Sequence, residues 1–284
     1  MKTILIPVDF SLTSSNALQY VADLSADIAI DRILLLKTHY VSIYSHIIPS
    51  AEYGQSNAQY ILEERTSIED QLLTVGQELL KKCGTDIRIE TVVSELPILR
   101  AVHDVLNDQK PNMLVLGSDA NGIESQIGEY VVEIAQISTV PILIIPSASH
   151  YRKVERILVP SDFDPVSQLS VLQKLQKLQL LLNPEIVILN VDPKPKQGRD
   201  EKILLNQLEE YLGSFSYEIN YSEEKNIAKG ILEFARQRDD IQLIVALPGK
   251  YSFFYNLTHN NITDAITLNA HIPVLILKEN YLYK

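Results

Sequence analysis

The sequence contains almost no cysteine and no long apolar run. Cys83 is the only cysteine among 284 residues, which excludes an intrachain disulfide and a zinc site built from several cysteines. No stretch approaches the roughly 18 apolar residues that a membrane-spanning helix needs. The apolar segment after Lys2 is also too short for the core of a secretory signal peptide. We therefore expect a cytoplasmic protein with no membrane partner.

Positive charge is also scarce. The chain has 25 Lys and Arg residues against 36 Asp and Glu residues, a formal net charge of −11 at pH 7. Such an excess repels nucleic acid, and no Lys/Arg-rich stripe offsets it locally. The six histidines have no cysteine partners and no i, i+4 spacing with one another. We expect neither nucleic acid nor a metal ion as a partner.

Common catalytic motifs are missing as well. The sequence has no G-x-S-x-G element around a nucleophilic serine. It also lacks G-x4-G-K-[S/T], and no G-x-G-x-x-G follows the first apolar run. No catalytic residue is assigned from the sequence.

What the sequence does contain is a repeat. The segment "ILIPVDFS" begins at Ile4, and "ILVPSDFD" begins at Ile157, 153 positions later. Near the end of each half, "VPILII" and "IPVLIL" place their prolines at Pro141 and Pro273, 132 positions apart. The halves are therefore duplicates of unequal length, and most of the difference follows the second expected strand.

Each copy alternates short apolar runs with longer helical patterns. The runs are almost continuously apolar, which is typical of strands covered on both faces and therefore of a parallel sheet. Right-handed crossovers between such strands give a doubly wound α/β sandwich. We predict two such domains, residues 1–147 and residues 153–284, joined by the polar segment "SASHYRK". The expected strands are Thr3–Val8, Ile33–Thr38, Ile87–Val92, Met113–Gly117, Ile142–Ile145, Ile157–Ser161, Ile186–Val191, Tyr217–Tyr221, Leu243–Leu247 and Val274–Leu277.

Two helices are of particular interest. Apolar residues recur at helical spacing between Ile61 and Leu80 and predict a helix before the third strand. In the second copy, Asp164 and Pro165 predict the N-cap and first position of a helix after the first strand.

A ligand site is expected at one end of each sheet. Doubly wound sheets bind ligands beyond the carboxyl ends of their strands, where the strand order reverses. In the first copy this rule selects Asp9 and Phe10 together with residues 117–129. In the second copy it selects Asp162 and Phe163 together with residues 248–261.

At these residues the sequence resembles the universal stress protein family, in its tandem two-domain form. The resemblance covers nearly the whole chain and is carried by "PVDFS" and "PSDFD", by "ILLLKT" and "IVILNV", and by the closing "VPILII" and "IPVLIL". It implies a flavodoxin-like, Rossmann-like sheet of five parallel strands in each domain, in the order 3-2-1-4-5. It also implies that the fifth strands of the two domains pair side by side. The function it implies is that of a non-catalytic regulatory protein, a fused pseudo-dimer with further homodimerisation left open.

The resemblance further implies an adenine-nucleotide site for ATP or AMP with Mg²⁺. Nucleotide-binding members carry a phosphate loop, G-x2-G-x9-G-[S/T], after the fourth strand. Gly117 matches its first glycine, while Ala120 replaces the second and Gly122 lies nearby. Gly128 matches the last glycine only in a loop two residues shorter, which leaves Glu129 at the hydroxyl position.

Glu129 weakens this nucleotide hypothesis. A carboxylate ~4–5 Å from a phosphate costs on the order of 3–4 kcal/mol per unit charge at an effective dielectric of ~20. We expect Glu129 to complement the positive end of the following helix in place of a bound anion. Nucleotide binding in the first domain is therefore expected to be weak or vestigial.

Asp9 is open to two compatible interpretations. By the resemblance, Asp9 contacts the adenine edge, and Val8, Phe10, Thr38 and Leu116 belong to the same pocket. By general chemistry, an aspartate at the carboxyl end of a strand orders the turn into the next helix by hydrogen bonding.

The second copy has diverged further. Asp162 and Phe163 are retained, but Gly249 is the only glycine of the loop after the fourth strand. Asn260 and Asn261 take the place of the final glycine and hydroxyl residue. Without glycine, the backbone cannot approach a pyrophosphate closely, so we expect Asn261 to cap a helix and the site to be vestigial.

Two other functions stay open at this point. The first is an ATP-dependent enzyme, either a slow ATPase or a self-phosphorylating protein. The second is an interaction scaffold that binds no ligand.

Overall fold

The computed structural model describes residues 2–40, 51–83, 86–119, 125, 127–163, 166–173, 183–191, 201–213, 215–247 and 269–278. All ten expected strands are present, each within two residues of its expected bounds. They are β1 Thr3–Pro7, β2 Arg32–Thr38, β3 Arg88–Ser94, β4 Met113–Ser118, β5 Ile142–Pro146, β6 Arg156–Pro160, β7 Glu185–Val191, β8 Tyr217–Ser222, β9 Leu243–Ala246 and β10 Val274–Ile276. The helices are α1 Leu12–Leu24, α2 Ala51–Cys83, α3 Ile98–Gln109, α4 Val131–Ile137, α6 Glu201–Leu212 and α7 Ile227–Gln237, with 3₁₀ helices η2 Gly128–Tyr130 and η3 Val166–Leu172.

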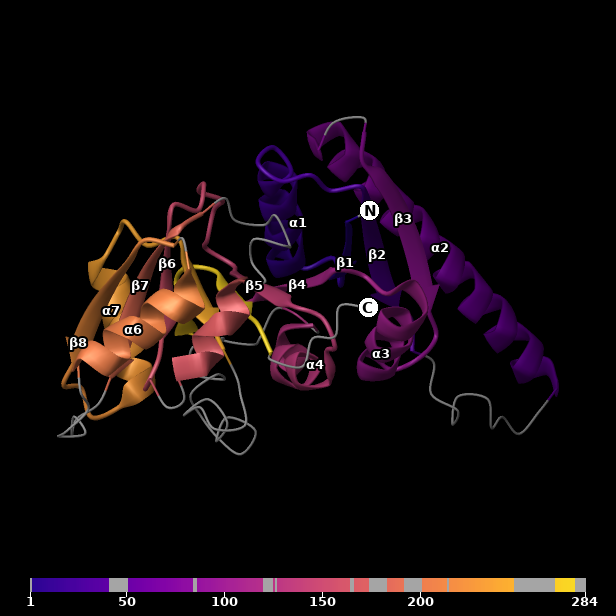
Figure 1. The fold of residues 1–284 in the computed structure, drawn as a ribbon. Coiled ribbons are helices and arrows are strands. Elements are labelled where there is room, and N and C mark those ends of the chain that lie inside the picture. The colour runs from indigo at the N-terminus through magenta and orange to yellow at the C-terminus, as the bar shows by residue number, and fades with distance from the viewer. Residues whose placement is uncertain are drawn as a thin grey trace.

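The strands form one continuous sheet in the order β3-β2-β1-β4-β5-β10-β9-β6-β7-β8 (Figure 1). The pair β5–β10 is antiparallel, and the other neighbouring pairs are parallel. The expected α/β fold with a mostly parallel sheet is therefore confirmed. The expectation of a five-stranded sheet in each domain needs a correction, because the pairing of the fifth strands, β5 with β10, joins all ten strands in one sheet.

The strand register follows the sequence repeat. Ile4 of β1 pairs with Ile33 of β2, and Ile157 of β6 pairs with Ile186 of β7, so both strands keep the 153-residue offset. At the centre of the sheet, Leu143 of β5 pairs with Leu275 of β10, 132 positions later. An antiparallel pair of equivalent positions is the arrangement that a two-fold axis produces.

Helices cover both faces of the sheet. Successive strand side chains point to opposite faces, so Ile33 and Leu35 join one apolar core while Leu34 and Leu36 join the other. The first core contains side chains of α1, α2, η3 and α6. The second core contains side chains of α3, α4 and α7. The molecule is thus a sandwich of three layers.

Two helices differ from expectation. Helix α2 has 33 residues, about 50 Å at 1.5 Å per residue, and begins ten residues before Ile61. Its N-terminal part extends past the strands in Figure 1, and from residue 59, where its side chains are described, the first buried one is Leu72. After β6, residues 166–172 form a 3₁₀ helix, while Asp164 and Pro165 lie outside the described residues.

Candidate functional site

The turn after β1 has an unusual backbone that recurs in the second half. Phe10 has a φ of 65°, and Phe163, its counterpart 153 positions later, has a φ of 58°. A bulky residue rarely adopts this left-handed conformation, which costs of order 1–3 kcal/mol. In the first half Ser11 follows as the N-cap of α1 and accepts a hydrogen bond from the Ser14 amide at 3.1 Å.

The Asp9 carboxylate joins this turn to the loop after β4. Its Oδ1 accepts hydrogen bonds from the Ser11 amide at 3.0 Å and the Ser11 hydroxyl at 2.5 Å. Its Oδ2 accepts hydrogen bonds from the Ser125 hydroxyl at 2.7 Å and the Ile127 amide at 3.1 Å. A carboxylate has about four acceptor sites, so these donors saturate it.

The hydrogen bonds determine the charge state of Asp9. Burial by itself raises the pKa of this carboxyl, but the Ser11, Ser125 and Ile127 donors outweigh burial and lower the pKa to about 2. Asp9 is therefore ionised at neutral pH. The carboxylate that accepts a hydrogen bond from the Ile127 amide, at the N-cap of η2, is that of Asp9, whereas Glu129 lies exposed within η2.

The glycines of the loop have packing reasons of their own. A Cβ on Gly117 would lie 2.5 Å from the Thr13 carbonyl oxygen, so the first turn of α1 packs directly on this backbone. A Cβ on Gly128 would lie 3.1 Å from the Ser125 Cβ, and the Gly128 amide donates to the Ser125 hydroxyl at 2.9 Å. Close helix packing accounts for Gly117 without a phosphate. Gly122, the remaining predicted glycine, lies outside the described residues.

The other predicted first-half residues lie around the same strand ends. Val8 and Leu116 are buried and belong to opposite cores, so their side chains do not converge. Thr38 ends β2 and is partly exposed. The structure thus brings Asp9 together with Ser125 and Ile127 and leaves Leu116 within the apolar interior.

The second half repeats the turn but not the surroundings. The register of β9 places Leu247 where the first half has Gly117, and Leu247 is buried. Asn190, the counterpart of Lys37, donates a side-chain hydrogen bond to the Ser161 carbonyl at 2.9 Å. Asp162 follows Ser161 at the same end of β6 and is partly exposed. Asn260 and Asn261 lie outside the described residues.

Two residues of the first-half site, Ser125 and Lys37, were not singled out from the sequence. Ser125 lacked a recognisable motif, because its role depends on a contact with Asp9 across 116 positions. Lys37 had a detectable signal: the alternation of Ile33 and Leu35 places a lysine at an inward-facing position of a buried strand. Its ammonium lies 5.3 Å from the centroid of the Phe10 ring.

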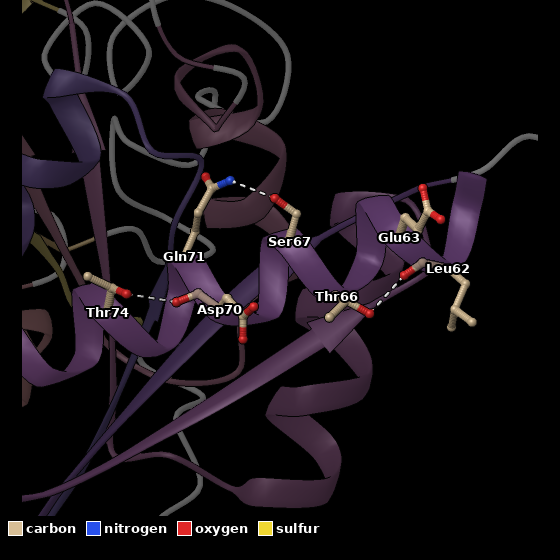
Figure 2. A pocket seen from close by; sticks show the side chains of 7 residues that line it. All are labelled: Leu62, Glu63, Thr66, Ser67, Asp70, Gln71 and Thr74. Carbon is tan, nitrogen blue, oxygen red and sulfur yellow. Dashed lines mark hydrogen bonds between the residues drawn. The ribbon is translucent and has the colours of Figure 1, made fainter. Parts of the chain in front are cut away.

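A separate depression of about 570 Å³ lies on the outer surface of α2 (Figure 2). Figure 2 shows that its lining side chains all come from this one helix. Thr66 and Thr74 donate to the Leu62 and Asp70 carbonyls at 2.9 Å, and Gln71 donates to Ser67 at 3.2 Å. These polar side chains form hydrogen bonds within the helix and do not converge on a ligand, so this depression is not the predicted site.

The described residues contain neither a membrane-spanning helix nor a cluster of metal ligands. Among the described helices, none combines the length and apolar composition required to cross a membrane. In the same part of the chain, no three histidine, cysteine or acidic side chains are grouped as a metal site.

A three-layer sandwich with polar side chains at the carboxyl ends of parallel strands defines a Rossmann-like α/β protein. A solved universal stress protein from Archaeoglobus fulgidus has this fold, with a TM-score of 0.64, 17% identity, and coverage of 97% of this chain and 96% of that one. A solved candidate universal stress protein from Pseudomonas aeruginosa is similar too, with a TM-score of 0.60 and 12% identity. The match covers 99% of this chain and 94% of that one. No curated protein matches the sequence. The model of the universal stress protein family matches residues 1–146, and the chain belongs to this family.

Proposed function

We propose that this chain is a non-catalytic regulatory protein of the stress response, built from two fused domains, residues 1–147 and residues 153–284, that form a pseudo-dimer. The pairing of Leu143 with Leu275 supports this division, because each residue meets its own counterpart across the central strands. The repeated left-handed conformation at Phe10 and Phe163 supports it as well. The absence of a long apolar helix among the described residues is compatible with the cytoplasmic location proposed here.

The saturated carboxylate of Asp9 carries the proposal. Its four hydrogen bonds hold the two segments around the first-half site in place without a ligand. An adenine nucleotide that contacts Asp9 must replace at least one of these donors, and each replacement offsets part of the binding energy. Weak adenine-nucleotide binding in the first domain follows, as a regulatory rather than a catalytic property.

An ATP-dependent enzyme is less well supported. A general base works best with a pKa near the operating pH, whereas the pKa of Asp9 is lowered to about 2. Its hydroxyl neighbours Ser11 and Ser125 already donate to it and are not activated as nucleophiles. For the second domain, a scaffold role without ligand is favoured by the buried side chain of Leu247 in place of a glycine.

The test is a thermal-shift and calorimetric titration with ATP, ADP, AMP and cyclic AMP, with and without Mg²⁺. Wild-type protein is expected to bind no tighter than about millimolar Kd, with a small rise in melting temperature. Glu129→Ser is expected to increase the response to ATP, because it removes a like charge. Nanomolar ATP binding by the wild type, or steady release of phosphate from ATP, would contradict the proposal.

A further inference from the structure

Lys37 is a buried cation with unusual surroundings. Only 9% of the surface of Lys37 is exposed. The residue lies near the carboxyl end of β2, at the same edge of the sheet as the first-half site. Among the described residues, no carbonyl, hydroxyl or carboxylate oxygen lies within hydrogen-bonding or ion-pair distance of its ammonium, and its contact is with the face of the Phe10 ring. Burying a charged group without a polar partner is costly, so buried charges are normally paired.

Lys278, a half-buried lysine of the described chain, shows what a satisfied ammonium looks like. Lys278 donates to the carbonyl oxygens of Ala135, Gln136 and Ser138 at 2.6, 3.0 and 3.1 Å. These carbonyls lie at the C-terminal end of α4, where a cation is favoured. Lys37 has no comparable set of acceptors among the residues described.

Asp9 does not supply the missing partner. Its carboxylate is near enough to raise the pKa of Lys37, although desolvation by burial outweighs that effect and lowers the pKa. All four acceptor sites of Asp9 are occupied by Ser11, Ser125 and Ile127. The ammonium therefore retains donors that an incoming anion can accept.

The second half provides an internal comparison. The register-equivalent position of Lys37 is Asn190, which is neutral and donates to the Ser161 carbonyl. The first half thus carries a positive charge that the second half lacks, although both keep the aspartate and the left-handed phenylalanine.

We propose that Lys37 is the anion-binding residue of the first-half site, and that it contacts a phosphate group, either that of a nucleoside monophosphate or free inorganic phosphate. This inference rests on the proposed ligand-binding role of the first domain. It assigns recognition of the phosphate to the end of β2 instead of the glycine-containing loop after β4. Phe10 orients the ammonium through a cation–π contact.

The first experiment is a calorimetric titration with AMP, adenosine and inorganic phosphate. Wild-type protein is expected to bind AMP about tenfold more tightly than adenosine, and Lys37→Met to abolish that preference. Lys37→Arg keeps the charge and is expected to retain the preference. Lys278→Met is the control on a half-buried lysine outside the first-half site, and this variant is expected to retain the preference too. An AMP preference that survives Lys37→Met, or that Lys278→Met also removes, would overturn the inference.

Two further readouts separate binding from structure. Without ligand, Lys37→Met is expected to melt no lower than the wild type, because it removes a desolvated ammonium that has no hydrogen-bond acceptor among the described residues. A lower melting temperature would indicate that Lys37 stabilises the fold and would count against the inference. In wild-type protein labelled with ¹³C-lysine, the Lys37 side-chain signal, assigned with Lys37→Arg, is expected to shift on addition of phosphate while that of Lys278 stays.

The two proposals can fail separately. If neither AMP nor adenosine binds but inorganic phosphate shifts the Lys37 signal, the nucleotide function is wrong and the anion site stands. If AMP and adenosine bind equally and phosphate leaves the Lys37 signal unchanged, the nucleotide function stands and the anion site is wrong.

Discussion

Tyr151, in the segment between the two halves, packs edge-on against Tyr20 of α1, with ring centroids 5.3 Å apart and an interplanar angle of 87°. The Tyr151 hydroxyl also donates to the Asp27 carboxylate. Asn16, one turn before Tyr20, donates to the carbonyl oxygens of Pro146 and Ser149, both at 3.0 Å. The connection between the halves is therefore anchored to the first half through α1.

Removing the Tyr151 ring is expected to destabilise the first half. Tyr151→Ala loses the aromatic contact and a hydrogen bond, at an expected cost of about 2 kcal/mol. Tyr151→Phe keeps the ring and is expected to lose only about 0.5–1 kcal/mol. Urea unfolding of both variants checks this order. Equal stability of Tyr151→Ala and the wild type would show that the anchor contributes nothing.

Two glycine substitutions are expected to have opposite effects. Gly117→Ala places a Cβ against the Thr13 carbonyl and is expected to cost about 2 kcal/mol or more, because helix α1 must move. Gly76→Ala, in α2, meets its nearest side-chain atom at 3.4 Å and is expected to stabilise the protein by about 0.5–1 kcal/mol through helix propensity. Melting temperatures of the two variants provide the check. A stable Gly117→Ala protein would reopen a phosphate-related role for this glycine.

The stability provided by Asp9 is expected to depend on pH. Its pKa is depressed in the folded protein, so its contribution is complete above the unfolded value near 4 and is lost as the pH falls toward about 2. Asp9→Asn is expected to cost about 1–2 kcal/mol at pH 7 and about a third as much at pH 2.5. Unfolding at both pH values measures the difference. Exposed Asp108 supplies the control, since Asp108→Asn is expected to change stability little at either pH.

Lys278 is expected to make the stability of the protein depend on pH in the alkaline range. Burial lowers its pKa to about 8, whereas an unfolded lysine titrates near 10.4. Between these values the unfolded chain binds more protons, so a rise in pH favours the folded state. The stability of the wild type relative to Lys278→Met is therefore expected to increase between pH 8 and pH 10. Exposed Lys81→Met is not expected to alter this dependence.

The sequence was sufficient to predict the positions of the strands and the burial of both faces of the sheet. Runs such as residues 33–36 and 113–116 are apolar at consecutive positions, a pattern typical of a strand that is buried on both faces. The repeat of "ILIPVDFS" as "ILVPSDFD" also predicted equivalent turns, which appear as matching left-handed conformations at Phe10 and Phe163. These features depend on local sequence patterns and can therefore be predicted from the sequence alone.

The site was harder to predict because its contacts are long-range. Gly117 suggested a phosphate loop, whereas its environment is the first turn of α1, more than 100 positions earlier in the chain. Ser125 carries no motif and gains its role only when β1 and β4 lie side by side. The placement of α1 against β4 and the donors around Asp9 are properties of the packed sheet, which a single sequence does not encode locally.

The antiparallel pairing of β5 with β10 also determines where this molecule can aggregate or extend. Each half would otherwise offer its fifth strand as an open hydrogen-bonding template, and pairing them inside the chain removes both. Among the described strands, the remaining sheet edges are β3 and β8, roughly 40 Å apart at about 4.8 Å per strand. Both carry charge, with Arg88 and Glu90 on β3 and Glu218 on β8, and charged rims disfavour the addition of another strand. The fusion of the two halves thus disfavours edge-to-edge association of the sheet with further copies of the chain.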